Sequence, residues 1–205
     1  MSWALWTTFA MVSAVNIVTP GPANLNTLRR ALQLGARRVV PTILGNALGL
    51  ALGGTLCAAG ITAFAMASPL WWQAFRWIGI AYLVWLGVKL LVKREKILSA
   101  EADGPAVRAH ALFAEAFLLA ASNPKALLFY IALFPQVLDP AQPLAPQAAL
   151  LIASYCALSI LSLGTYSALA QLLRRSVMTQ ARYDRFRQVS GVVLIGFALK
   201  LMLGA

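Results

Sequence analysis

Long apolar stretches alternate with short polar connections along the whole chain. An α-helix needs about 20 consecutive apolar residues to cross the roughly 30 Å hydrocarbon core of a bilayer. Stretches of that order recur along the sequence, so we predict an all-α integral membrane protein with six transmembrane helices in a single transmembrane domain, residues 1–205. The predicted segments are residues 3–28, 39–66, 71–91, 112–134, 145–173 and 189–203.

Two of these stretches contain residues that cannot continue a helix. Segment one contains Thr19-Pro20-Gly21-Pro22, and segment four contains Ser122-Asn123-Pro124-Lys125. Proline lacks the backbone N–H and its ring clashes with the preceding turn, while glycine is entropically costly in a helix. Broken backbone at membrane depth is tolerated only where it is buried in protein or lines a polar cavity. We therefore predict that segments one and four are broken and that the two breaks form one binding site, as in secondary transporters with discontinuous helices.

Composition supports a membrane location. Of the 205 residues, 60% are hydrophobic and 11% are charged, with a mean hydropathy of +0.76, whereas soluble domains average about 25% charged residues. The formal net charge of +11 is carried by short basic clusters between the apolar stretches. Such clusters are typical of residues that set membrane orientation, so we expect no nucleic-acid partner.

The basic residues fall into alternate connections. Four lie between segments one and two, five between three and four, and five between five and six, against one between two and three and none between four and five. Because basic connections stay in the cytoplasm, we predict that both termini lie on the outer side of the membrane. The longest connection, about residues 93–110, is then a cytoplasmic loop.

The two halves of the chain show a weak likeness to each other. Residues 79–85 (GIAYLVW) and 191–197 (GVVLIGF) each belong to the third segment of their half. Three helices per half force the second copy to insert in the opposite orientation. We predict two inverted three-helix repeats, about residues 1–92 and about residues 111–205.

Lys125 is the one basic residue inside the middle of an apolar segment. Burying a lysine there costs about 2.5 to 3.5 kcal/mol on insertion scales, so its side chain should face a cavity or a partner. Two interpretations remain open. Lys125 either donates to carbonyl oxygens released by a helix break, or it meets the carboxylate of a substrate together with the helix N-terminus that follows Pro124.

Neutral polar side chains occur at depths that match the breaks: Asn16, Thr19, Asn24, Asn26, Asn46 and Asn123. Asn24 follows the first break closely, so its amide either caps the break or faces the pathway. Segment five carries a polar series at roughly helical spacing: Ser154, Tyr155, Ser159, Ser162, Thr165 and Tyr166. This series indicates either a wetted stripe or hydroxyls that bond their own preceding turn.

Segment two has Gly45, Gly49 and Gly53 at four-residue spacing. Small residues at this spacing let another membrane helix approach closely. The neighbour could belong to the same chain or to a second subunit, so a homodimer is one arrangement that this face would permit.

The chain lacks the patterns of other chemistries. Glu115 falls near the start of segment four, and no Asp or Glu is expected at the membrane centre. Cys57 and Cys156 lie far from further metal-type ligands, and the sole histidine, His110, is placed at the end of the loop. No nucleophile stands at catalytic spacing from a base. We expect no enzyme activity, no metal site and no cofactor.

Several stretches, taken together, resemble the LysE/RhtB family of bacterial amino-acid exporters over essentially the whole chain. They are residues 19–24 (TPGPAN), 35–38 (GARR) before a glycine-rich helix, 79–87 (GIAYLVWLG), 123–126 (NPKA) and 134–136 (FPQ). Each is weak alone, but their order and spacing are specific.

The resemblance implies a six-helix, multi-pass protein of the bacterial inner membrane that exports amino acids or close derivatives as an antiporter for protons or another coupling ion. With the orientation predicted from the basic residues, both termini are then periplasmic. Its implied functional core is the set of break residues Pro20, Gly21, Pro22, Asn123, Pro124 and Lys125. With Thr19, Asn24 and Asn46, these are the predicted substrate-binding or transport residues. The family commonly has Asn directly after the second proline, where this chain has Ala23 and carries Asn24 one position later. One residue turns a helical side chain by about 100°, so this amide points in a different direction.

Two alternative functions stay open at this point. The first is an exporter of metal or other ions, which clustered acidic, histidine or cysteine side chains at membrane depth would favour. The second is a non-transporting assembly subunit of a membrane complex, for which the glycine face of segment two would be the contact surface.

Overall fold

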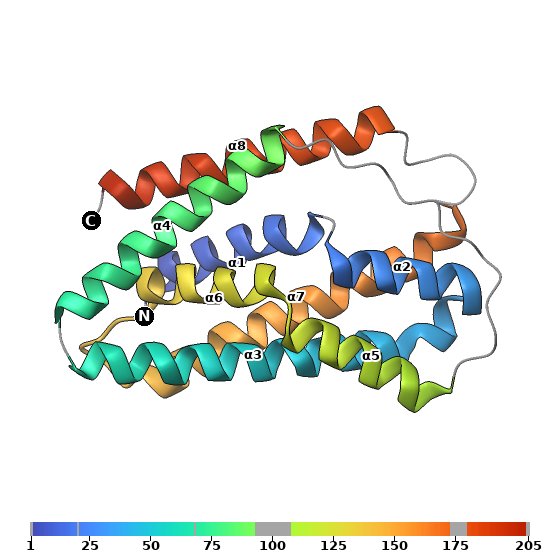
Figure 1. The fold of residues 1–205 in the computed structure, drawn as a ribbon, viewed down its shortest axis with the longest axis horizontal. Helices are drawn as coiled ribbons and strands as arrows, with labels where there is room; N and C mark the ends of the chain where they lie inside the picture. The colour runs from blue at the N-terminus through green and yellow to red at the C-terminus, as the bar shows by residue number, and fades with distance from the viewer. Residues whose placement is uncertain (1, 20, 68, 93–107, 173–179, 204–205) are drawn as a thin grey trace.

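The computed structural model describes residues 2–19, 21–67, 69–92, 108–172 and 180–203. Within these residues the chain is helical and contains no β-strand (Figure 1). The elements are α1 (Trp3–Val18), α2 (Pro22–Leu34), the 3-10 turn η1 (Ala36–Val39), α3 (Val40–Ala67), α4 (Pro69–Val92), α5 (Ala109–Ala121), α6 (Pro124–Val137), α7 (Leu144–Leu172) and α8 (Gln180–Leu203). The predicted all-α class is confirmed.

Both predicted breaks are present. The axes of α1 and α2 are bent by 56° and those of α5 and α6 by 47°. At the first break, Thr19 has extended backbone (φ −62°, ψ 119°), and α2 begins at Pro22. At the second, α6 begins at Pro124. Proline suits the first helical position because its missing N–H would have no intrahelical partner there.

Several helix ends extend beyond the predicted segments. Helix α2 continues through Arg29 and Arg30 to Leu34, and α8 begins at Gln180, well before its apolar part. His110, which we predicted to lie in the loop, belongs to the first turn of α5, so the loop is shorter at this end. The predicted segments were bounded by apolarity, whereas backbone hydrogen bonds continue a helix into charged residues.

Length and hydropathy identify fewer spans than six. Among the described helices, Ala36–Ile61 and Leu144–Leu169 are each long and apolar enough to cross a membrane alone. Counting each bent pair as one span raises the number to four. Six spans arranged as inverted repeats therefore stay a prediction.

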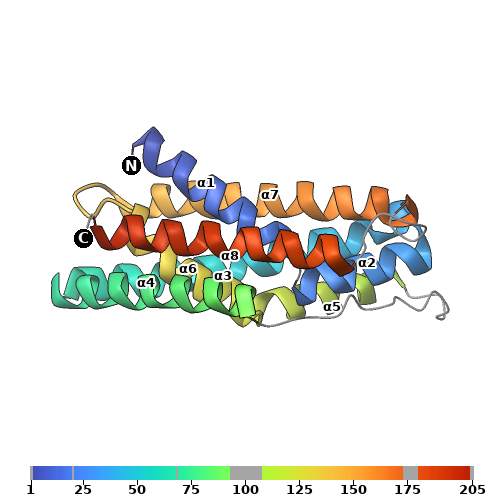
Figure 2. The ribbon, with the colours of Figure 1, turned by 90° about the horizontal axis from the view of Figure 1, so that it is seen from above.

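The helices of the two halves are interleaved. Helix α3 packs against α5 and α6, while α7 packs against α1 and α2. Each long helix thus covers the broken pair of the other half. Helix α4 packs against α6 and α8, which closes the bundle on one side (Figure 2). Both chain ends lie at the same end of the bundle, opposite the connection from α2 to α3 (Figure 1).

Helix α3 has two distinct faces. A Cβ atom on Gly45 or Gly49 would collide with the backbone of Phe113 or Phe117, so α3 and α5 touch backbone to backbone. The neighbour of the predicted glycine face is therefore a helix of the same chain. A second face exposes large apolar side chains at four-residue spacing, Leu44, Leu48, Leu52 and Leu56. Such a continuous apolar stripe fits contact with lipid.

Helix α6 is the most deeply buried helix around the breaks. Phe129, Tyr130 and Phe134 have no exposed surface, and the ring of Tyr155 on α7 lies 4.9 Å from that of Tyr130 and 5.6 Å from that of Phe129. This aromatic packing fixes α6 against α7 directly beside the second break.

Candidate functional site

The carbonyl groups at the end of α1 are each hydrogen-bonded despite the break. The last four carbonyls of an α-helix have no partner within the helix. Here Lys125 Nζ donates to the carbonyl oxygens of Asn16 at 2.7 Å and Thr19 at 2.8 Å. Asn24 Nδ2 donates to that of Ile17 at 2.8 Å, and the Tyr166 hydroxyl donates to that of Val18 at 2.9 Å. Side chains from α6, α2 and α7 therefore converge on one helix end.

Lys125 reaches this helix end from the first turn of α6. Asn123 caps α6, because its side-chain oxygen accepts a hydrogen bond from the Lys125 backbone N–H at 3.1 Å. On the opposite side of the contact, a Cβ atom on Gly21 would lie 3.6 Å from Lys125 Cδ and Nζ. Because Gly21 has no side chain, the backbone of the first break passes close to the Lys125 ammonium group. Of the two interpretations of Lys125, the carbonyl contact is the one present in this conformation, and the carbonyls belong to the other break.

Two buried asparagines lie next to this contact. Asn16 and Asn46 are 1% and 2% exposed. Asn16 Nδ2 donates to the Tyr155 hydroxyl at 2.9 Å, and Asn46 Nδ2 donates to Ser159 Oγ at 3.0 Å. Tyr155 and Ser159 are four residues apart on α7, so they share one face of that helix. The side-chain oxygen of each asparagine has no hydrogen-bond partner among the described residues.

These groups line a small polar cavity of about 30 Å³. Its lining residues include Asn16, Gly21, Asn24, Asn46, Asn123, Lys125, Tyr155 and Ser159. A cavity of this size holds about two water molecules, which is too little for an amino acid. The conformation described is therefore a closed one.

A second cavity, of about 450 Å³, lies between α1 and α7 and is lined mainly by apolar side chains such as Leu158, Leu161 and Leu169. A charged ligand loses its hydration in such surroundings without gaining a partner. We therefore take the smaller polar cavity as the candidate site, although the apolar one is larger.

The structure brings most of the predicted site residues together. Thr19, Gly21, Asn24, Asn123 and Lys125 meet as described above, and Pro124 starts α6 beside them. Asn46 joins them across the cavity from α3. Pro22 starts α2, and Pro20 lies outside the described residues. Whether these residues bind substrate stays a prediction; for Asn24, the structure shows a capping hydrogen bond.

Three residues of the polar series on α7 belong to the site. Tyr155, Ser159 and Tyr166 hydrogen-bond to groups at the end of α1 and on α3. Ser154 also contacts the other half, but it accepts a hydrogen bond from Trp6 Nε1 near the start of α1, and the Thr165 hydroxyl bonds only its own preceding turn, at Leu161. The polar spacing along segment five indicated the helix face. It could not indicate which hydroxyls have partners, because those partners lie more than a hundred residues away in sequence.

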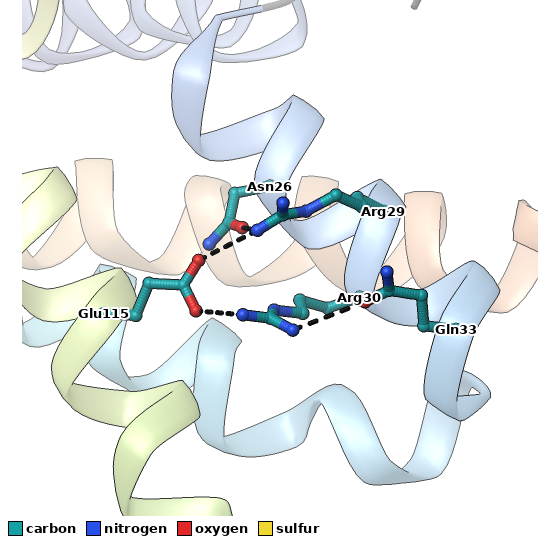
Figure 3. A network of polar contacts seen from close by, with 5 residues as sticks. All are labelled: Asn26, Arg29, Arg30, Gln33 and Glu115. Carbon is teal, nitrogen blue, oxygen red and sulfur yellow. Dashed lines mark hydrogen bonds and ion pairs between the residues drawn. The ribbon is translucent and has the colours of Figure 1, made fainter. Parts of the chain in front are cut away.

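An ion-pair network joins α2 to α5 (Figure 3). Glu115 accepts hydrogen bonds from Arg30 at 2.5 Å and from Arg29 at 3.1 Å. Asn26 and Gln33 flank the two guanidinium groups and accept hydrogen bonds from them at 3.1 and 3.3 Å. The sequence placed Glu115 near the cytoplasmic interface but indicated no partner. The network connects α2 and α5, which are the halves of the two broken segments on the predicted cytoplasmic side of the cavity.

The described residues contain no group of three His, Cys, Asp or Glu side chains that could hold a metal ion. Glu101 and Asp103 lie outside the described residues. The chemistry that this site offers is thus hydrogen bonding and a single lysine ammonium.

Comparison with known proteins gives a consistent result. A family model described as LysE type translocator matches residues 14–205. An uncharacterized membrane protein of Vibrio cholerae is 30% identical over 197 residues, covering 96% of both chains. A leucine efflux protein of Klebsiella pneumoniae is 28% identical over 93% of this chain and 92% of its own length. A homoserine/homoserine lactone efflux protein of Salmonella typhimurium is 27% identical over 83% of this chain and 82% of its own length. No solved structure matches the chain.

Proposed function

Because the chain belongs to the LysE type translocator family, we propose that it exports amino acids or closely related small zwitterions from the cytoplasm. The relatives named as efflux proteins for leucine and for homoserine support this substrate class. The observation that carries the proposal is the contact of Lys125 Nζ with the carbonyl oxygens of Asn16 and Thr19. It places a cation, which can bind the carboxylate of a zwitterion, beside main-chain acceptors, which can bind its ammonium group.

Substrate binding is then an exchange of partners. The carboxylate of the substrate pairs with the Lys125 ammonium, and the substrate ammonium takes over carbonyl oxygens that Lys125 releases. The exchange leaves no buried charge unpaired, which matters because an isolated ion in a low-dielectric site is very costly. Asn123 and Pro124 contribute by fixing the helix turn that carries Lys125, and the α6 N-terminus adds a favourable dipole for the carboxylate.

The same exchange would loosen the contact between the two breaks. In the closed conformation Lys125 ties α6 to the end of α1, and the cavity is too small for substrate. A substrate that replaces these hydrogen bonds allows the two halves to separate on one side of the membrane. Alternating access between two inverted repeats is the transport cycle that we propose. Because each long helix packs on the broken pair of the other half, each of the two moving bodies combines helices of both repeats: α3 with α5 and α6, and α7 with α1 and α2.

We propose that export is coupled to proton entry as an antiport. Among the residues that the structure describes, Lys125 is the only charged one that lines the cavity. Lys125 stays charged while it pairs with the substrate carboxylate, so the proton that enters in exchange is an additional one. The empty site has to take it up on the outside and release it to the cytoplasm before the next substrate binds. The protein then acts in the bacterial cytoplasmic membrane with both termini periplasmic, as the distribution of basic residues indicates.

The test is transport in everted membrane vesicles from cells that express the protein. Labelled amino acids, including L-leucine and L-homoserine, are offered with an imposed pH gradient and again after a protonophore has removed it. We expect uptake of at least one amino acid that collapses with the gradient. If no amino acid enters at a rate above vesicles without the protein, the substrate class is wrong; uptake that ignores the gradient overturns only the coupling.

Neither alternative gains support from the structure. An ion exporter would need ligands for the ion, and the described cavity is lined by amides, hydroxyls and a lysine. For an assembly subunit we expected the glycine face of α3 to be the contact with a partner, but α5 of the same chain covers that face.

A further inference from the structure

The two asparagines at the cavity are held in a way that is unusual for buried amides. Buried polar groups are nearly always hydrogen-bonded, and an exception needs an explanation. In Asn16 and Asn46 the amide nitrogen donates to a hydroxyl of α7, while the amide oxygen has no donor among the described residues. The two asparagines, on α1 and α3, belong to the lining of one cavity, and their side-chain oxygens are buried beside it.

The hydroxyls of α7 fix the direction of both amides. In an amide group the oxygen and the nitrogen point to opposite sides of the carbon that joins them. Because Tyr155 and Ser159 hold the nitrogens on the α7 side, the two oxygens are turned away from α7. Two buried acceptors beside the cavity are therefore oriented before any ligand arrives, and a ligand reaches them when the site opens.

We propose that the side-chain oxygens of Asn16 and Asn46 form the subsite for the substrate's primary ammonium group. This inference rests on the proposed function and deepens it. An ammonium group has three N–H donors. Two are met by these amide oxygens, and the third is met by the carbonyl oxygen of Asn16, which Lys125 releases when it turns to the carboxylate.

The arrangement explains how a site that contains a lysine binds a molecule with a positive charge. Neutral amide oxygens attract the charged ammonium through their dipoles. A carboxylate in their place would form an ion pair with Lys125 and compete with the substrate. The subsite recognises N–H groups. We therefore expect it to reject both a substrate whose ammonium is removed and one whose ammonium is fully methylated.

The experiment measures binding by thermal stabilisation of the purified protein in detergent, since a ligand that binds only the folded state raises the melting temperature. The probes are the proteinogenic L-amino acids and L-homoserine. The best binder is then compared with its desamino acid (4-methylpentanoate for leucine, 4-hydroxybutanoate for homoserine) and with its N,N,N-trimethyl derivative. For the unmodified protein we expect both derivatives to bind at least tenfold more weakly than the amino acid.

The variants Asn16→Leu and Asn46→Leu each replace one amide by an apolar group with the same branching. We expect each to reduce the preference for the amino acid over its desamino acid by about tenfold, while binding of the desamino acid itself stays unchanged. Asn46→Gln keeps a neutral amide oxygen, so it retains most of the preference. Thr55→Val is the matched control, because Thr55 lies on α3 with Asn46 but bonds only to Ala51 of its own helix.

The outcomes separate the two proposals. If no amino acid stabilises the unmodified protein, the proposed function fails and the subsite fails with it. If an amino acid binds and the leucine variants keep the full preference, the ammonium subsite is wrong while the function stands. If a leucine variant does not fold, Asn46→Gln and Ser159→Ala decide. The first must keep the preference, and the second, which releases the Asn46 amide, must weaken it.

Discussion

The Nζ atom of Lys125 lies 2.7 Å from the carbonyl oxygen of Asn16, although the two residues are 109 positions apart in the chain. One belongs to the first turn of α6 and the other to the last turn of α1. Each break alone would leave main-chain groups unsatisfied inside the bundle. Together they satisfy each other, because the ammonium of one break fills the acceptor positions of the other.

Replacing Lys125 with methionine should destabilise the protein and abolish transport. The carbonyl oxygens of Asn16 and Thr19 would lose their charged donor, at a cost of about 1.5 to 3 kcal/mol. The measurements are the melting temperature in detergent and amino-acid uptake into everted vesicles. Lys125→Arg is the control for charge; we expect it to recover more stability than transport, because a planar guanidinium does not reproduce the geometry of an ammonium. Methionine at this position with unchanged uptake would disprove the role of Lys125.

Replacing Tyr166 with phenylalanine should lower stability by about 1 kcal/mol, because the Val18 carbonyl loses its donor. The matched control is Thr165→Val on the same helix, since the Thr165 hydroxyl bonds only to Leu161. Thermal unfolding of both variants in the same detergent makes the comparison. Equal effects of the two changes would show that the Tyr166 hydroxyl does not stabilise the end of α1.

A larger residue at Gly49 should disrupt the bundle. A Cβ atom there would collide with the backbone of Phe117, which cannot move aside as a flexible side chain could. Overpacking of this kind costs about 1 to 3 kcal/mol. We expect Gly49→Leu to reduce the amount of folded protein, measured by size-exclusion chromatography in detergent. Gly60→Ala on the same helix is the control, because its Cβ would meet no atom within 4 Å and should leave the yield unchanged.

The ion pair of Arg30 with Glu115 should make a small, salt-dependent contribution. Their side chains are 16% and 34% exposed, so solvent screens the attraction. A double-mutant cycle with Arg30→Gln and Glu115→Gln should give a coupling free energy of about 0.2 to 1 kcal/mol, and less at high salt. A cycle with Arg76→Gln in place of Arg30→Gln provides the control, because Arg76 interacts with Gln136 and not with Glu115. A coupling equal to that control would mean that the contact contributes nothing.

The predicted orientation can be tested by cysteine labelling in a variant whose Cys57 and Cys156 are replaced by alanine. We expect Ser2→Cys to react with a membrane-impermeant maleimide in spheroplasts, because the N-terminus is predicted to be periplasmic. Arg37→Cys lies in the connection from α2 to α3 and should react only after the membrane is opened. The reverse labelling pattern would show that the N-terminus is cytoplasmic and the α2–α3 connection periplasmic, which would contradict the predicted orientation.

The sequence allowed the positions of the two breaks to be predicted, because proline and glycine in an apolar stretch limit the local backbone strongly. It did not allow the contacts between the breaks to be predicted. The partner of Lys125 depends on how α6 is turned about its axis, and that angle follows from the aromatic packing of Phe129 and Tyr130. Likewise, Asn16 was one of several polar residues in segment one, and only its pairing with Tyr155, 139 positions away, shows its orientation.

The helix ends show the same limit in another form. An apolar pattern marks the part of a helix that can lie in lipid, and it ended before Arg29 and Arg30. The helix itself continues, and this places both guanidinium groups beside Glu115. A charged residue at the boundary of an apolar segment can therefore form a contact within the protein. The apolar pattern alone does not reveal such a contact.

The small volume of the polar cavity also has a consequence for proton leakage across the membrane. Space for about two water molecules does not hold a continuous file of water from one face of a membrane to the other. The carbonyl oxygens at the end of α1 already accept hydrogen bonds from lysine, asparagine and tyrosine donors, so they are not available to order further water molecules. In this conformation the protein insulates, so a cell could keep many copies in its membrane without dissipating the gradient that respiration maintains.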